Sequence, residues 1–287
     1  MRKLTGHTRP FAVLGHPIGH TLSPVMHNAA LEALGLDAIY LAFDVEPARL
    51  LGVLPAMADL GFGGVNLTVP LKEVAFRGLE HLEPEARLLG AVNTVEILPN
   101  RELRGHNTDG YGFVAALREA FGIEARGRAV FVLGCGGAGR AVALTCAQAG
   151  AERLTLADAD SERARRLSAE IAAAAPGTPA AVAPAADWAA AARDAELVVQ
   201  ATPVGMRRGE PSLLGPEAFR PGQFVYDLIY MYPRTAFMDA ALAAGAAVSN
   251  GLGMLLHQGA RALEIWTGRQ PPLAVMHRAL EAEVYGS

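Results

Sequence analysis

The stretch 130–141 constrains the fold of this chain more than any other part of the sequence. It begins with four apolar residues and continues into a glycine turn in which Gly134, Gly136 and Gly139 have the spacing G-x-G-x-x-G. A short apolar run bounded by glycine is typical of a strand that is buried on both faces of a parallel sheet. In a dinucleotide-binding unit the three glycines permit the tight turn, the approach of a pyrophosphate to the backbone and close helix packing. The residues that we expect at the phosphates are Gly134, Gly136, Gly137 and Ala138.

The acidic residue Asp158 favours NAD over NADP. It follows the next apolar run, 153–157, and lies roughly 20 to 25 residues beyond Gly134, where the ribose-binding acid of a dinucleotide fold is found. A carboxylate there accepts hydrogen bonds from the ribose hydroxyls and repels a 2′-phosphate. Three arginines close behind it are in principle able to meet a phosphate, although their pattern better suits the solvated face of the next helix. They are Arg163, Arg165 and Arg166.

The composition excludes several classes of protein. A chain of 287 residues is long enough for two domains, and its net charge of −4 gives no electrostatic reason to expect nucleic acid or an anionic membrane as a partner. Two cysteines are too few for a disulfide framework, and the sequence shows neither a signal-peptide pattern nor an apolar run of about 18 residues. We therefore expect a cytoplasmic monomer or homodimer that acts on a small molecule.

The first part of the chain, 1–110, alternates predicted strands and helices. Strands are expected at 11–15, 39–43 and 64–69, and helices at 24–34 and 47–60. We expect Ser23 to cap the first helix and Pro24 to take its first position. This alternation predicts an α/β domain with a mainly parallel sheet. Because that domain carries no phosphate-binding turn, it is the candidate substrate domain.

The stretch 111–250 completes the nucleotide-binding domain. Its pattern predicts a doubly wound, Rossmann-like sheet with helices between the strands. The strands are expected near Val130, Thr155, Ala181, Leu197, Phe224 and Val248. Two more helices are expected at 253–266 and 271–285, within a C-terminal segment 251–287.

Polar stretches follow the predicted strands of the first domain. They are 15–24, 66–72, 90–94 and 107–110, the last after a probable hairpin near Asn100. Side chains beyond the carboxyl ends of parallel strands line the ligand crevice of an open α/β sheet. Each stretch alone reads as ordinary cap or turn chemistry. Together they indicate a site for one polar substrate.

These stretches, taken in order, resemble the shikimate dehydrogenase family. The early motifs are G-x-P-I-x-H-x-x-S-P-x-x-H-N from Gly15, G-x-N-x-T-x-P-x-K from Gly64, G-A-V-N-T from Gly90 and N-T-D-G from Asn107. The later motifs are A-T-P-V-G-M from Ala201, Y-D-L-I-Y from Tyr226 and G-L-G-M-L-L-H-Q-G-A from Gly251. The match covers nearly the whole chain, and several motifs are more specific than the glycine turn.

The resemblance implies reversible, nicotinamide-dependent reduction of 3-dehydroshikimate to shikimate. Hydride transfer to a ketone creates an alkoxide that needs a proton, so the site requires a positioned acid. Lys72 is the candidate acid, with Asp109 beside it as in similar enzymes. The resemblance also implies that the C-terminal helices return to pack on the first domain.

The resemblance further assigns the binding residues. Those expected at the substrate carboxylate are Thr21, Ser23 and Tyr230, and those at the ring hydroxyls are Asn66, Thr68, Asn93 and Gln258. Thr202 is expected near the nicotinamide end of the cofactor, and Gly251 and Met254 are further expected cofactor-binding residues. No Cys, His and Asp residues have metal-ligand spacing, so we expect no metal.

Two departures from the commoner family pattern leave alternatives open. The usual H-S-x-S reads H-T-L-S here, and the added methyl of Thr21 crowds the carboxylate pocket and bears on the choice between shikimate and quinate. The usual N-R-T, whose arginine meets the NADP 2′-phosphate, is replaced by Asp158 and Ala159, which resembles the NAD-using quinate/shikimate branch. The alternatives are an NAD-dependent quinate dehydrogenase, a dual quinate/shikimate enzyme and, more remotely, a non-catalytic ligand-sensing paralogue.

Overall fold

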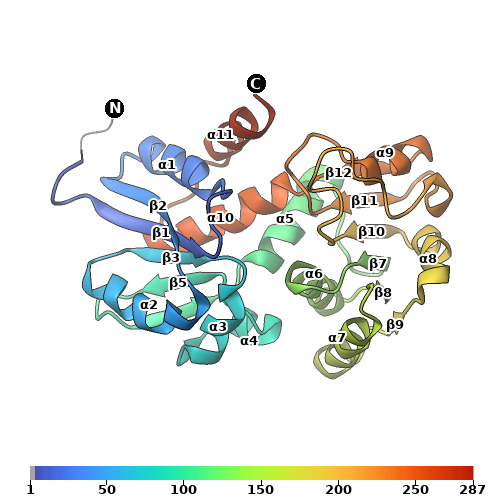
Figure 1. Ribbon diagram of the computed structural model, residues 1–287, viewed down its shortest axis with the longest axis horizontal. Coiled ribbons are helices and arrows are strands. Elements are labelled where there is room, and N and C mark those ends of the chain that lie inside the picture. Colours follow the sequence, from blue (N-terminus) through green and yellow to red (C-terminus); the bar gives the residue numbers. More distant parts are fainter. Residues whose placement is uncertain (1–3, 287) are drawn as a thin grey trace. The chain divides into compact units, whose positions relative to one another are not determined.

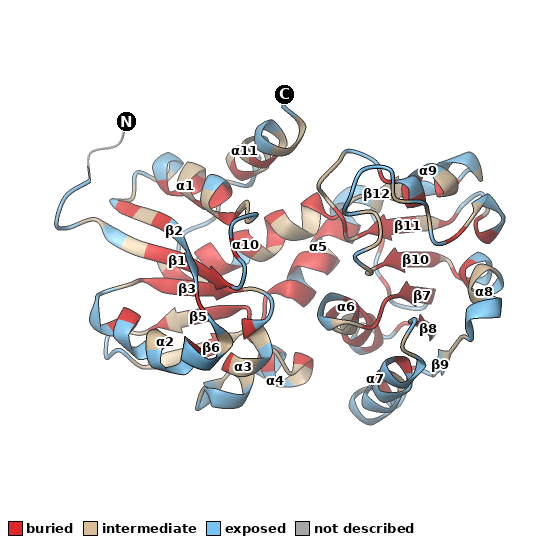
Figure 2. Cartoon of the chain, viewed as in Figure 1, coloured by how far each residue is buried: buried red, intermediate tan, exposed pale blue. Residues whose placement is uncertain are grey.

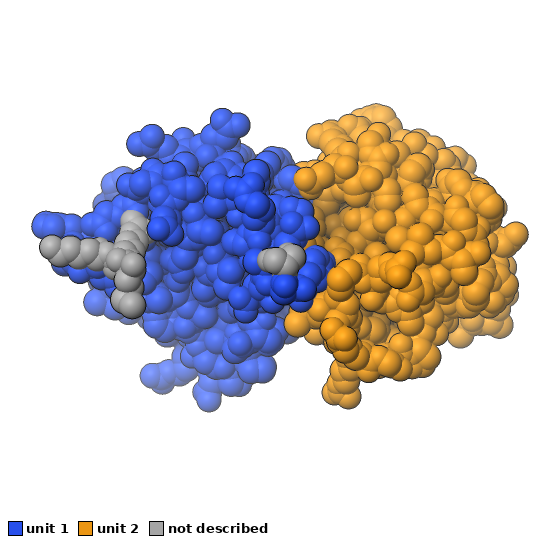
Figure 3. Space-filling view, turned by 90° about the horizontal axis from the view of Figure 1, so that it is seen from above, with its two compact units in different colours: residues 1–112, 256–287 blue, residues 113–255 orange. Residues whose placement is uncertain are grey.

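The computed structural model describes residues 4–286 and divides into two compact units. One unit comprises residues 1–112 and 256–287, and the other comprises residues 113–255 (Figure 3). Each unit contains a six-stranded sheet covered by helices (Figure 1). The α/β fold class predicted from the sequence is therefore confirmed.

The sheet of the first unit has the strand order β2-β1-β3-β5-β6-β4. Strand β1 pairs in parallel with both β2 and β3, whereas β5 is antiparallel to β3 and β6. The hairpin expected near Asn100 makes β5 and β6 antiparallel to each other. The strands are β1 (Arg9–Gly15), β2 (Ala38–Asp44), β3 (Gly64–Leu67), β4 (His81–Leu82), β5 (Thr94–Ile97) and β6 (Leu103–His106).

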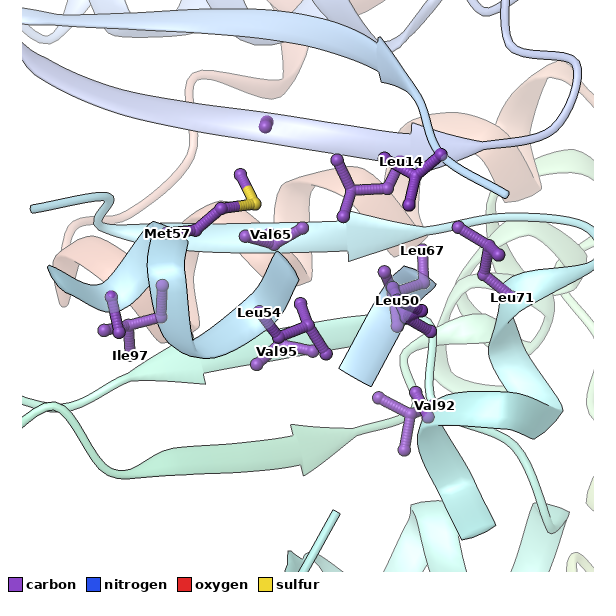
Figure 4. Close-up of a cluster of buried hydrophobic side chains, with 14 of the residues drawn as sticks. Leu14, Leu50, Leu54, Met57, Val65, Leu67, Leu71, Val92, Val95 and Ile97 are labelled. Carbon is purple, nitrogen blue, oxygen red and sulfur yellow. The ribbon is translucent and has the colours of Figure 1, made fainter. Parts of the chain in front are cut away.

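Helices cover both faces of this sheet. Successive side chains of β1 point to opposite faces, so their contacts show which helices cover each face. Ala12 and Leu14 face a buried apolar cluster formed with α2 and α3 (Figure 4). Phe11, which points to the other face, stacks on Trp266 of helix α10 (Leu252–Thr267) at 5.3 Å between ring centroids. Helix bounds are α1 (Ser23–Ala33), α2 (Leu50–Asp59) after a 3-10 turn Pro47–Arg49, α3 (Leu71–Gly78), α4 (Pro84–Leu89) and α11 (Leu273–Tyr285).

The sheet of the second unit is parallel throughout, with the order β12-β11-β10-β7-β8-β9. The order reverses at β7, so that β7 and β10 are neighbours at the topological switch point where doubly wound folds bind ligands. All six strands lie where the sequence predicts them. They are β7 (Ala129–Leu133), β8 (Arg153–Ala157), β9 (Ala180–Val182), β10 (Leu197–Gln200), β11 (Phe224–Asp227) and β12 (Ala247–Ser249).

The strands β7 and β10 are buried along their whole length, because helices cover both sides of this sheet too (Figure 2). One face packs on α8 and α9 in a cluster that includes Phe131, Val198 and Phe237. Helix α6 packs against β7 and against α7. Helix bounds are α6 (Gly137–Gln148), α7 (Ser161–Ala174), α8 (Trp188–Asp194) and α9 (Ala236–Ala243), with 3-10 turns Ala185–Asp187 and Pro216–Ala218.

Two helices have residues in both units. They are α5 (Asp109–Phe121) and α10 (Leu252–Thr267). The part of α10 that belongs to the first unit, together with α11, confirms that the C-terminal helices pack on the first domain. Within the part of the chain that the structure describes, no helix has both the length and the apolar character needed to cross a membrane.

Candidate active site

Lys72 and Asp109 form a partly buried ion pair in the first unit. Lys72 lies in the first turn of α3, and Asp109 is the first residue of α5. The ammonium Nζ lies 2.7 Å from Oδ2 of Asp109, with side-chain exposures of 28% and 12%. This geometry gives a charge-assisted hydrogen bond between a proton donor and a carboxylate that fixes its direction. It is the arrangement a carbonyl reduction requires of its acid.

Asn93 organises the groups around this pair. Its amide Nδ2 lies 2.9 Å from Oδ1 of Asp109, 2.9 Å from Oγ1 of Thr108 and 3.4 Å from Oε1 of Gln258. Its Oδ1 accepts the backbone N–H of Thr108 at 2.9 Å and the hydroxyl of Thr94 at 3.0 Å. Asn93 is 2% exposed, so these bonds are shielded from competing water.

The turn 107–109 fixes the carboxylate from the other side. The side chain of Asn107 accepts the backbone N–H of Asp109 at 2.9 Å and donates to the carbonyl of Ala91 at 2.9 Å. These bonds tie the start of α5 to the loop after α4. Thr108, which the sequence analysis did not select, is 2% exposed and bonded to Asn93. The signal was present, because Thr108 stands inside the N-T-D-G motif.

The hydroxyls of Thr21 and Ser23 lie together at the start of α1, with 3.3 Å between their oxygens. The expectation that Ser23 caps this helix is wrong. Leu22 occupies the N-cap without a side-chain hydrogen bond, and Ser23 is the first helical residue. The Ser23 hydroxyl instead accepts the hydroxyl of Thr21.

Three further expected substrate residues lie in this unit. Asn66 is 6% exposed and its amide donates to the carbonyl of Asn93 and to the Thr94 hydroxyl, so little of its hydrogen-bonding capacity remains for a ligand. Thr68 follows β3 and is half-buried, and its backbone N–H donates to the carbonyl of Leu14. Gln258 reaches Asn93 from α10. The expected substrate residue outside this unit is Tyr230, in the second unit, where burial raises its pKa.

The glycine turn of the second unit presents open backbone. A side-chain carbon added at Gly136 or Gly137 would meet no heavy atom within 4 Å. By contrast, one added at Gly139 would overlap the carbonyl oxygen of Gly134, and Gly134 itself has a φ of +101°. The turn therefore divides into glycines that the fold requires and glycines that leave room for a ligand. Since no side chain caps α6, its first N–H groups are available to a phosphate.

Asp158 follows β8 with its side chain 7% exposed. One oxygen accepts the backbone N–H of Cys135 at 2.7 Å and the other accepts that of Asp160 at 2.8 Å. The guanidinium of Arg163 lies 3.2 Å from the same carboxylate and 3.4 Å from Asp160. The carboxylate thus braces the glycine turn, and each of its oxygens accepts one backbone N–H and one bond from the Arg163 guanidinium.

A buried carboxylate braces the loop that carries Thr202. Asp227 accepts the hydroxyl of Thr235 at 2.6 Å and the backbone N–H of Ile229 at 3.0 Å. Gln200 donates to the carbonyl of Val204 at 2.9 Å and extends to Asp227 at 3.4 Å. Burial raises the pKa of Asp227 to about 6. The sequence analysis did not select Asp227 or Gln200.

The two remaining cofactor candidates lie at the start of α10. The phenol of Tyr226 accepts the backbone N–H of Met254 at 3.1 Å, and Gly251 donates its N–H to the carbonyl of Ile229 at 3.1 Å. Gly251 lies so close to the backbone of Leu228 that a side chain there would clash. These contacts join the end of β11 to the first turn of α10.

Both cysteines of the chain lie in the second unit. Cys135 and Cys146 are both buried and free, and burial raises the pKa of each thiol to about 12. Within residues 4–286 no three His, Cys, Asp or Glu side chains gather as a metal site requires.

The parallel sheet with its open glycine turn in one unit, and the lysine–aspartate pair in the other, define an oxidoreductase of the dinucleotide-binding class. Residues 13–95 match the family model of the shikimate dehydrogenase substrate binding domain. Residues 251–281 match that of the shikimate 5'-dehydrogenase C-terminal domain. The curated protein "Shikimate dehydrogenase (NADP(+))" of Moorella thermoacetica is 45% identical over 98% of this chain and 95% of its own length.

Solved structures agree with the sequence matches. Shikimate 5-dehydrogenase of Listeria monocytogenes, in complex with shikimate and NAD, superposes with a TM-score of 0.91 at 33% identity and covers 98% of this chain and 99% of its own. Quinate dehydrogenase of Corynebacterium glutamicum, in complex with NAD, superposes with a TM-score of 0.89 at 30% identity and covers 96% and 99%. The chain belongs to the shikimate dehydrogenase family.

Proposed function

We propose that this protein is a shikimate dehydrogenase, which interconverts 3-dehydroshikimate and shikimate with a nicotinamide dinucleotide. The observation that carries the proposal is the Lys72–Asp109 pair, held by Asn93 inside a chain that matches family members over almost its whole length. A catalytically silent relative would have no need to keep a buried acid and its carboxylate partner in hydrogen-bonding contact.

Lys72 moves the proton. In the reducing direction its ammonium donates to the oxygen that becomes the hydroxyl, and in the oxidising direction the neutral amine takes that proton back. Asp109 orients the ammonium of Lys72 through its Oδ2 and accepts a hydrogen bond from a substrate hydroxyl. Asn93 donates to Oδ1 of Asp109, which keeps Oδ2 directed at the lysine. The nicotinamide, when bound, supplies or accepts the hydride.

The polar residues of the first unit bind the ring acid. Thr21 and Ser23 offer adjacent hydroxyls at a helix start, which suits a carboxylate. Thr68, Asn93 and Gln258 bind the ring hydroxyls, and the remaining acceptor position of Asn66 provides a further contact. Tyr230 adds a phenol to the carboxylate site.

The second unit holds the dinucleotide. The open backbone at Gly136 and Gly137 fits a pyrophosphate, and the uncapped start of α6 supplies N–H donors to it. Gly134 and Ala138 shape that turn. The nicotinamide end is bound by Thr202, Gly251 and Met254. Hydrogen bonds of Gln200, Asp227 and Tyr226 hold the loops that carry these residues.

NAD(H) is the preferred cofactor in this proposal. We expect the carboxylates of Asp158 and Asp160 to repel a 2′-phosphate, and the one nearby cation, Arg163, already contacts both of them. Ala159 offers no charge. The name of the Moorella thermoacetica relative specifies NADP(+). If this chain used NADP(H) as well, Arg163 would have to turn from Asp158 to the 2′-phosphate.

Quinate is the second candidate substrate, because the chain is similar to a quinate dehydrogenase and the extra methyl of Thr21 changes the shape of the carboxylate pocket. The test is kcat/KM for shikimate and quinate, each with NAD⁺ and NADP⁺, on one preparation. We expect shikimate with NAD⁺ to give the highest value. A quinate preference would assign the second candidate, and ring-acid binding without turnover would assign a sensor.

A further inference from the structure

Gly15 is a buried glycine whose backbone does not require glycine. It is the last residue of β1 and opposes Asp44 at the end of β2. Its φ is not among the positive values of the chain, so an L residue could adopt the same conformation. The reason for a glycine here must therefore lie in what surrounds it.

The space beside Gly15 is taken by the methyl of Thr68. A Cβ added at Gly15 would lie 2.5 Å from Cγ2 of Thr68 and 2.7 Å from Cδ1 of Ile18. Carbon atoms in contact are about 3.5 to 4.0 Å apart, so both neighbours would have to move. Cδ1 of Ile18 can turn about its own terminal bond, and it carries no polar atom with it.

Thr68 has no such freedom. Its backbone N–H donates to the carbonyl of Leu14 at 2.9 Å, and its carbonyl accepts the N–H of Leu71 at 2.8 Å, so its Cβ is held in place. The methyl and the hydroxyl are both bonded to that Cβ. The methyl therefore cannot rotate away from Gly15 without turning the hydroxyl by about 120° to another staggered position.

The hydroxyl of Thr68 differs from the other threonine hydroxyls of this region. Those of Thr94 and Thr108 are buried and bonded to Asn93. That of Thr68 is half-buried and makes no hydrogen bond with another residue of the described range 4–286. Its direction is therefore set by the packing of its methyl, and not by a polar partner in the protein.

We infer that Gly15 is a positioning residue for the substrate: because it lacks a Cβ, the Thr68 methyl packs against it, and this contact directs the Thr68 hydroxyl to a ring hydroxyl of the bound acid. The inference rests on the proposed function, which assigns Thr68 to the ring hydroxyls. It gives the first glycine of the motif G-x-P-I-x-H a role in substrate binding that is exerted through the next strand of the sheet.

The test is Gly15→Ala, which adds a single methyl group. Room for this methyl is made when Thr68 rotates, and one hydrogen bond to the substrate is then lost. We expect KM for shikimate to rise about tenfold, with kcat and the KM for dinucleotide changed less than about twofold. Gly52→Ala, on α2, is the matched control and should change none of these constants, because its Cβ would meet no atom within 4 Å.

Two second changes identify which contact is responsible. Thr68→Ser removes the methyl and keeps the hydroxyl, so in that background Gly15→Ala should raise KM for shikimate by less than about twofold. Ile18→Val removes Cδ1 instead, and in that background the rise should remain about tenfold. A rise that Ile18→Val abolishes and Thr68→Ser leaves in place would overturn the inference, as would an unchanged KM in Gly15→Ala alone.

Two further measurements separate binding from stability and from the proposed function. If Gly15→Ala melts near the assay temperature, calorimetric titration with shikimate at about 10 °C supplies the comparison, and wild-type affinity there would refute the inference. Thr68→Val keeps the methyl and loses the hydroxyl, and it should raise KM for shikimate about tenfold. An unchanged KM in this variant would remove Thr68 from the substrate site and the inference with it. Because wild-type turnover is measured in parallel, either failure would leave the proposed function standing.

Discussion

The polar cluster around Asn93 is built from side chains, whereas the glycine turn after β7 is built from backbone. In the first, buried amides, hydroxyls and one carboxylate bond each other. In the second, Gly136 and Gly137 leave open space that a ligand would occupy. The difference teaches where a substitution acts: removing a side chain from the cluster changes chemistry, and adding one to the turn changes cofactor binding.

The two units also differ in how each holds a buried aspartate. Asp109 pairs with the cation of Lys72, whereas Asp227 accepts from the neutral donors of Thr235, Ile229 and Gln200. A carboxylate that is buried among neutral donors loses more solvation than they return, and this is why the pKa of Asp227 rises.

The largest effect is expected at Lys72. Lys72→Ala should lower kcat by on the order of 10² or more with little change in the KM for shikimate, because the lost interaction belongs to the transition state. Steady-state kinetics measure this fall in kcat, and Glu73→Ala, at the exposed neighbouring residue, is the control. Near-normal turnover of the alanine variant would remove Lys72 from the mechanism.

A pH-dependent stability is expected from Asp227. Its pKa is raised from 3.8 to about 6 in the folded protein, so the folded state binds this proton more tightly than the unfolded state. The resulting stabilisation is complete below about pH 4 and is lost as the pH rises through about 6, up to about 3 kcal/mol in total.

The variant Asp227→Asn removes that titration. The difference in unfolding free energy between variant and wild type should therefore shift in favour of the variant between pH 4 and 7. Denaturant unfolding at both pH values measures the shift, with Asp239→Asn, a change at an exposed carboxylate of α9, as control. A difference that stays constant with pH would show that Asp227 keeps an ordinary pKa.

The glycine turn should separate into two kinds of glycine. Gly136→Ala should fold normally, because its Cβ would meet nothing and φ is −69°, while KM for the dinucleotide rises about thirtyfold. Gly139→Ala should instead destabilise the unit by about 2 kcal/mol, since its Cβ overlaps Gly134. Thermal melting of both variants measures the stability effect, and dinucleotide titration measures the binding effect. Equal behaviour of the two would refute the division.

The smallest effect is expected at the ribose end of the dinucleotide. Ala159→Arg adds a cation beside Asp158 and should shift the ratio of kcat/KM for NADP⁺ over NAD⁺ about tenfold toward NADP⁺. Ala159→Gln is the control for bulk without charge. A wild-type preference for NADP⁺ would mean that Arg163 already captures the phosphate and that Asp158 serves only to brace the turn.

Regular strands were predictable from the sequence for a physical reason. Parallel strands that are buried on both faces must be apolar, and therefore β7 and β10, which are buried along their whole length, are visible as short runs bounded by glycine or polar residues. The motifs also bring Lys72, Asn93 and Asp109 together in the structure as expected.

Buried polar partners were harder to predict, because hydrogen-bond partners depend on tertiary contacts. Tyr40 reads as one more apolar strand residue although its phenol donates to Asn66, and Ser23 reads as a helix cap although its hydroxyl accepts that of Thr21. A tyrosine at a core position is nonetheless a usable signal, since its hydroxyl must find a partner. Asp227, at the end of β11, is a similar case.

The most direct test of the contrast between side-chain chemistry and backbone binding is the single-turnover rate of dinucleotide reduction by shikimate, with both ligands saturating. Lys72→Ala and Gly136→Ala are measured beside the wild type. We predict a fall on the order of 10² or more for the lysine variant and a rate within about twofold of wild type for the glycine variant. A slow chemical step in Gly136→Ala, or a wild-type rate in Lys72→Ala, would contradict the account.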